Sequence, residues 1–220
     1  MKQYLTILAV LTFGALAPVA TAAPEAPAAP AVTLPIDPTL SPAEQKAVRT
    51  FMLKSMRASV LALQQQAELT NPTVWQMLEA SMTSSSTIPL DGLPANYQAY
   101  VKEIRALNEY ALSHLQGTDK PMDQLTPEDA ALMQESLADI QQKTAAIEAR
   151  YPEVARYLGT AALTQLTQDF ITKAGILRKV MAEVMSRQNE LQGDQSKVMQ
   201  LSQQLTMKLL LEEIDKLLAE

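Results

Sequence analysis

Residues 160–191 read TAALTQLTQDFITKAGILRKVMAEVMSRQNEL and carry a stripe of apolar side chains. Its members recur three, four or seven positions apart, at Leu163, Leu166, Phe170, Ala174, Leu177, Met181, Val184 and Leu191. This spacing places them on one side of a single long α-helix, which we expect to run from Thr160 to Leu191. Gly175 then falls inside the helix, on the side away from Phe170. Because a helix buries such a stripe only against other helices, the segment predicts an all-α fold.

Similar patterns surround this segment and predict further helices. They cover roughly Ser41–Leu69, the residues after Asn71-Pro72, Pro94–Gly117, Thr126–Tyr151 and the chain after Gly193-Asp194. In the fourth of these, apolar positions from Met133 to Tyr151 alternate steps of four and three, as in a short coiled coil. We therefore expect residues 41–220 to form one domain, an antiparallel bundle of five or six helices.

The N-terminal residues 1–22 have the features of a secretory signal peptide. Lys2 supplies the positive charge, Tyr4–Leu16 the short apolar run, and Ala20-Thr21-Ala22 the small residues of a cleavage site. We expect cleavage after Ala22, with Ala23 nearly as suitable. Residues 23–40 form a Pro/Ala-rich flexible linker, because its prolines favour extended, unpacked backbone. These features predict a periplasmic or secreted protein.

The composition excludes several classes of function. The net charge is −6 and no basic stripe is visible, so nucleic acid is not an expected partner. The chain contains no cysteine, which excludes disulfides, cysteine-ligated metals and cysteine nucleophiles. No later stretch is apolar over a bilayer's thickness, so no membrane-spanning segment is expected after signal cleavage.

The sequence offers no recognisable catalytic or cofactor-binding constellation. His114 is the single histidine, lies near Tyr110 at the edge of its helix's apolar stripe, and lacks the spacings of a zinc or haem site. There is no Gly-x-Ser-x-Gly motif, no glycine-rich phosphate loop and no evident carboxylate pair. We therefore expect no enzyme, no cofactor and no metal.

Two pairs of methionines stand one helical turn apart, Met52/Met56 and Met181/Met185. This spacing could hold Cu(I) through two thioethers. Methionine at helical spacing is more often adaptable core filling, which is the favoured interpretation of both pairs.

The last predicted helix is apolar on two nearly opposite sides. Val198, Leu201 and Leu205 mark one side, and the other is marked by Met207, Leu210, Leu211, Ile214, Leu217 and Leu218. A helix of this kind is buried on both sides, either within its own chain or against a partner. The second set is therefore the candidate partner-contact surface, with Leu210, Ile214 and Leu217 as anchors for a helix-in-groove contact or for self-association.

Two short motifs, Leu40-Ser41-Pro42-Ala43-Glu44 and Leu125-Thr126-Pro127-Glu128-Asp129, open predicted helices. They resemble the Leu-Thr-x-x-Gln repeats of the small periplasmic stress chaperones of the Spy and CpxP type, with Glu44 and Asp129 in place of the glutamine. Helix capping by Ser41 and Thr126 also explains both motifs.

These features together predict an exported, non-catalytic helical interaction or structural protein of the cell envelope. The alternative, which the resemblance suggests, is a periplasmic holdase that binds unfolded clients on an apolar face. A bundle that carries a ligand or metal is a third hypothesis.

Overall fold

The computed structural model describes residues 32, 34–67, 69, 72–116, 119–191 and 194–220. Across these ranges the regular structure is helical, without a strand beyond an isolated bridge between Thr73 and Pro121. The prediction of an all-α fold is therefore confirmed. None of the helices in these ranges is long and apolar enough to cross a bilayer. The predicted signal peptide, residues 1–22, and most of the linker lie outside the described residues.

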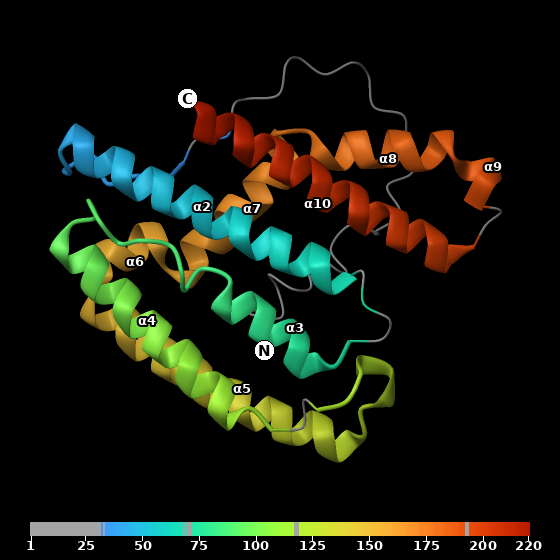
Figure 1. Ribbon diagram of the computed structural model, residues 1–220, viewed down its shortest axis with the longest axis horizontal. Helices are drawn as coiled ribbons and strands as arrows, with labels where there is room; N and C mark the ends of the chain where they lie inside the picture. The colour runs from blue at the N-terminus through green and yellow to red at the C-terminus, as the bar shows by residue number, and fades with distance from the viewer. Residues whose placement is uncertain (1–31, 33, 68, 70–71, 117–118, 192–193) are drawn as a thin grey trace. The chain divides into compact units, whose positions relative to one another are not determined.

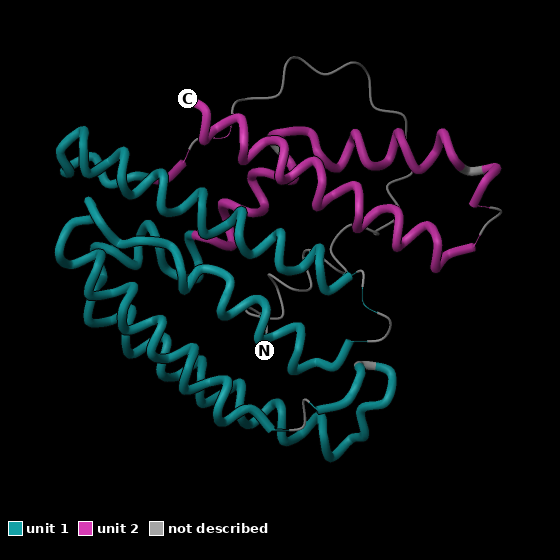
Figure 2. The backbone as a smooth tube through the Cα atoms, in the orientation of Figure 1, with its two compact units in different colours: residues 1, 36–162 teal, residues 2–35, 163–220 magenta. Residues whose placement is uncertain are grey.

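The described residues group into two compact units, which we treat separately (Figure 2). Unit 1 covers Ile36–Ala162, and the helices of unit 2 lie within Leu163–Glu220. The boundary between the two units lies near the start of the segment from which the sequence analysis began.

Unit 1 is built from helices that pack on their neighbours in the chain (Figure 1). Its elements are α2 (Pro42–Ala67), α3 (Val74–Thr83), α4 (Ala95–His114), the 3₁₀ turn η1 (Met122–Gln124), α5 (Pro127–Arg150) and α6 (Pro152–Leu158). Helix α2 packs on α3, α3 on α4, and α4 on α5, while α6 contacts both α4 and α5. The coiled-coil-like stripe of α5 faces the interior as predicted, with Leu137, Ile140, Thr144 and Ile147 buried.

The two short motifs are helix caps. Ser41 Oγ donates to Glu44 Oε2 at 2.6 Å, before the first turn of α2. At α5, Thr126 and Asp129 form a complete capping box. A hydrogen bond from Lys120 Nζ to Asp129 Oδ2, 2.7 Å long, together with those from Thr126, lowers the pKa of Asp129 to about 2. Local capping chemistry therefore accounts for the residues that carry the resemblance.

Helix α7 (Thr160–Lys173) begins in the last residues of unit 1 and continues into unit 2. Unit 2 also contains α8 (Ile176–Ser186), the single turn α9 (Gln188–Leu191) and α10 (Gln195–Ala219). Helices α8 and α10 lie side by side and run in opposite directions, joined through α9 (Figure 1). Ile176 and Val180 are buried on α8, and Lys179 Nζ approaches Glu213 Oε1 of α10 at 3.5 Å. The two helices thus combine an apolar interior with an exposed ion pair.

The prediction of one continuous helix from Thr160 to Leu191 is wrong. Helix α7 ends at Lys173, and Gly175 precedes α8 in the left-handed conformation, with φ 68°. Since side chains with a Cβ rarely adopt that conformation, glycine here ends one helix and allows the next to begin. A second interruption at Arg187 separates α8 from α9. The apolar stripe is real, but short helices carry it.

Because of this break, Gly175→Ala should lower the stability of the protein rather than raise it. Inside a continuous helix, alanine would stabilise the protein by about 0.5–1 kcal/mol. At φ 68° we instead expect a loss of about 1–2 kcal/mol in the free energy of unfolding, because alanine is strained in the left-handed region. No heavy atom lies within 4 Å of a Cβ built at Gly175, so crowding does not confuse the result. Urea unfolding measures the change, and a gain in stability would contradict the break.

Candidate functional site

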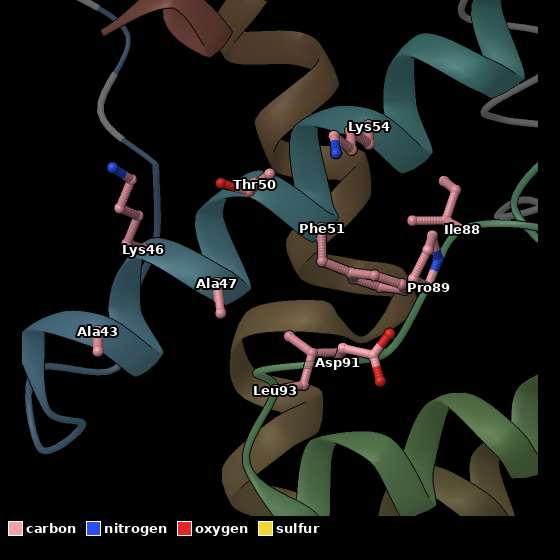
Figure 3. A pocket seen from close by; sticks show the side chains of 10 residues that line it. All are labelled: Ala43, Lys46, Ala47, Thr50, Phe51, Lys54, Ile88, Pro89, Asp91 and Leu93. Carbon is pink, nitrogen blue, oxygen red and sulfur yellow. The ribbon is translucent and has the colours of Figure 1, made fainter.

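A groove opens on unit 1 between α2 and the loop that joins α3 to α4 (Figure 3). Its volume is about 300 Å³. The residues that line it are Ala43, Lys46, Ala47, Thr50, Phe51, Lys54, Ile88, Pro89, Asp91 and Leu93. All of them come from α2 or from the loop, so the groove belongs to unit 1 alone.

The groove has an apolar interior and a charged rim. Phe51 extends from α2 toward Pro89 (Figure 3), and the methyl group of Ala47 lies near Gly92 of the loop. Lys46 and Lys54 leave the same helix at its exposed edge, two turns apart, and Asp91 stands on the loop side. Helix α2 carries four basic residues and a single acidic one, although the chain as a whole is acidic. A ligand here would meet an apolar floor beside a locally positive helix.

Backbone geometry and hydrogen bonds hold the loop side of the groove in place. Arg105 of α4 donates from Nη2 to the carbonyl oxygens of Ser85 and Ile88 at 2.7 and 2.6 Å. Asn108 Nδ2 donates to the Met82 carbonyl at 3.1 Å. At the end of the loop, the Leu93 N–H donates to the Leu90 carbonyl oxygen, and Gly92 between them has a φ of 81°. The groove is therefore largely preformed.

Burying the guanidinium group of Arg105 costs free energy. Desolvation lowers the pKa of its guanidinium, and its Nε atom is buried without a hydrogen-bond partner. Its two bonds to carbonyl oxygens compensate for part of that cost. We infer that Arg105 positions Ile88 and the wall of the groove.

Replacing Arg105 tests this role. We expect Arg105→Met to lower the free energy of unfolding by about 1–3 kcal/mol, because two backbone carbonyls lose a charged donor. Arg105→Lys should recover only part of the loss, since an ammonium lacks the planar fork of the guanidinium. Chemical denaturation measures both variants, and an unchanged midpoint for Arg105→Met would show that the loop does not depend on it.

The single histidine lies at a second, smaller hollow of about 230 Å³ between α4 and α5. His114 is exposed, and its ring stacks on Tyr110, its neighbour one turn earlier, with 3.9 Å between centroids. Its Nδ1 atom lies 2.8 Å from both the Tyr110 carbonyl oxygen and Ser113 Oγ. Bonds from Lys143 and Tyr110 hold the pKa of Asp139 below its usual value. Among the described residues, no three His, Asp or Glu side chains gather in a way that could hold a metal ion.

No family model, curated protein or solved structure matches this chain. The groove and the surfaces of the described helices are therefore the basis for any functional proposal.

The candidate contact surface on α10 is less open than its sequence suggests. Met207, Leu210 and Ile214 are buried, and Leu211, Leu217 and Leu218 are half-buried. Two of the three expected anchors, Leu210 and Ile214, have no exposed surface. In this structure a partner can reach only the half-buried leucines of the set.

The groove was missed by sequence reasoning, and only a weak signal could have indicated it. Pro89 and Asp91-Gly92 are typical of a loop, and Phe51 is at helical spacing from other apolar residues of its segment. Nothing in the local pattern indicates that the loop lies against α2, since the hydrogen bonds that hold the loop come from Arg105, 17 and 20 residues away in the chain.

Proposed function

We propose that this chain is an exported, non-catalytic interaction protein that binds a segment of a partner protein in the α2 groove. The observation that carries the proposal is a preformed, apolar groove whose rim carries charges of both signs. Such a site can bind and orient a ligand, while the residues around it include no nucleophile paired with a base.

The size and chemistry of the groove favour a protein segment. Its volume is at the lower end of the range for small-molecule sites, about 300–1,000 Å³, and suits one or two apolar side chains. Lys46 and Lys54 complement a carboxylate beside such a side chain, and Asp91 can accept from a backbone N–H. The same size argues against the holdase hypothesis, since a holdase needs a broad apolar face for unfolded clients.

Two further parts of the proposal come from the sequence. We propose that a signal peptide ending near Ala22 directs the chain to the periplasm or beyond, and that the helices form an antiparallel bundle. Mass spectrometry of the protein recovered from the cell envelope tests the first part. A mass that includes residues 1–22 would contradict it.

Binding can be tested with a peptide probe and nuclear magnetic resonance. The probe is a short synthetic peptide with one leucine flanked by glutamates, titrated into the ¹⁵N-labelled mature chain. We expect saturable shifts of the Ala47, Phe51 and Leu93 amides, weakening with added salt because exposed charges contribute. Shifts confined to other parts of the chain would overturn the assignment of the site.

Lysine variants test the rim with a matched control. Lys46→Gln plus Lys54→Gln should weaken binding of the peptide several-fold, since each exposed charge pair contributes about 0.2–1 kcal/mol. Lys102→Gln is the control, because Lys102 is exposed on α4 of the same unit and does not line the groove. Equal effects from the rim and control variants would indicate nonspecific attraction rather than a site.

A further inference from the structure

The two methionine pairs singled out by their spacing lie in different environments. Met52 of the first pair is 1% exposed and fills the core of unit 1, as expected. Met181 and Met185 are 41% and 68% exposed, so core filling is the wrong interpretation of the second pair. The buried contacts of α8 come instead from Ile176 and Val180. Both methionines of the second pair are therefore exposed side chains that the packing of α8 does not require.

We propose that Met181 and Met185 form a surface site for a soft monovalent metal ion, Cu(I) or Ag(I). Thioether sulfur is a soft ligand that selects such ions over harder divalent cations. The chain has no cysteine, so no thiol of its own competes for the metal. The site lies on unit 2 and is independent of the proposed groove.

Helix geometry places the two methionines on one face of α8. Residues four apart lie on the same face, with Cβ atoms about 5–6 Å from each other. Helical side chains lean toward the N-terminus, so Met185 extends over the turn that carries Met181. Three rotatable bonds in each side chain allow both sulfurs to approach one ion. Two thioethers leave further positions on the ion open to water or to a donor from another molecule.

The nearby charged groups do not supply the ligands. Glu183 is already paired with Arg187, whose Nη2 lies 2.7 Å from its Oε1. Lys179 approaches Glu213 on the other helix. Because a thioether has no proton to lose, metal binding should not depend on pH in the range where histidine and carboxylates titrate.

A titration of the mature chain under anaerobic conditions tests the site. Cu(I) is added in competition with a chromophoric chelator, and Ag(I) serves as the redox-inert probe. We expect one ion per chain, with shifts confined to the ¹³C-methyl signals of Met181 and Met185. Met181→Leu and Met185→Leu should each weaken binding at least about tenfold, because leucine keeps the size and helix propensity but removes the sulfur.

The control is Met199→Leu. Met199 is 39% exposed on α10 and has no second methionine one turn away, so its loss should leave the affinity unchanged. Binding that survives either α8 substitution would overturn the proposal, as would methyl shifts at other methionines. Loss of binding between about pH 7 and pH 5 would also overturn it, because it would assign the metal to His114 or to carboxylates.

Discussion

Leu210→Ala is expected to lower the free energy of unfolding by about 2–5 kcal/mol, among the largest effects of any single truncation in unit 2. The Leu210 side chain is 0% exposed, on the face of α10 that also buries Ile214. Truncation removes buried methyl groups and leaves a cavity that the packed helices fill only in part. Urea denaturation measures the loss, and Lys208→Ala, at an exposed position of the same helix, should change stability by less than about 0.5 kcal/mol.

A double substitution separates this role from that of a partner anchor. Leu210→Asp plus Ile214→Asp places two carboxylates in the interior and should unfold unit 2, since burying an unpaired charge is prohibitive. Circular dichroism should then show lost helix and light scattering should show aggregation or expansion. A well-folded double variant that differs only in oligomer mass would mean that these leucine and isoleucine side chains face a partner.

Two substitutions of Tyr97 should change the stability of the protein in opposite directions. Its ring is fully buried in unit 1, whereas its hydroxyl is buried without a hydrogen-bond partner. Tyr97→Ala should destabilise the protein by about 3–5 kcal/mol through the lost ring. Tyr97→Phe keeps the ring and removes the unsatisfied hydroxyl, so we expect a gain of about 1 kcal/mol. A loss on Tyr97→Phe, measured by thermal unfolding, would mean that the hydroxyl has a partner such as a bound water.

The alkaline pH dependence provides a second readout for Tyr97. Burial, with smaller contributions from Asp37, Tyr157 and Glu153, raises the pKa of Tyr97 to about 12 from an ordinary value of 10.0. The folded state favours the neutral phenol. The stability that Tyr97 contributes is therefore fully present below about pH 10 and is lost as the pH rises toward 12. Over that range the wild type should lose more stability than Tyr97→Phe. Parallel curves for the two proteins would contradict the raised pKa.

Helix beginnings were predictable because capping is local. Ser41, Thr126 and Asp194 each precede a helix and accept or exchange hydrogen bonds with residues two or three positions later. The side chains involved are close in sequence wherever the rest of the chain lies. Helix α2 ends at Ala67, close to the predicted Leu69.

The break at Gly175 was not predictable from apolar spacing. Phe170, Ala174 and Leu177 keep helical intervals across it, so the pattern is the same for one helix as for two. What differs is a single backbone angle, and glycine permits either conformation. The exposure of Met181 and Met185 was missed for a related reason, because spacing identifies a shared face but not what covers it.

The groove depends on contacts between distant segments. Arg105 reaches back to Ser85 and Ile88, and Ser59 of α2 lies 3.1 Å, oxygen to oxygen, from Ser84. Neither contact can be inferred from the types of the residues or from the spacing of apolar positions. Sequence therefore indicated the elements of unit 1 but not the surface between them.

The most direct test of the groove blocks it with a label on an introduced cysteine, which is unique because the chain has none of its own. Ala43→Cys places a unique thiol on an exposed residue that lines the groove, and a bulky methanethiosulfonate reagent can modify it reversibly. Labelled Thr172→Cys, at an exposed position of α7, is the control. We predict that the label at position 43 abolishes binding of the acidic leucine peptide, that reductant restores it, and that the label at position 172 has no effect. Undiminished binding to the protein labelled at position 43 would contradict the proposal that the α2 groove is where this chain holds its partner.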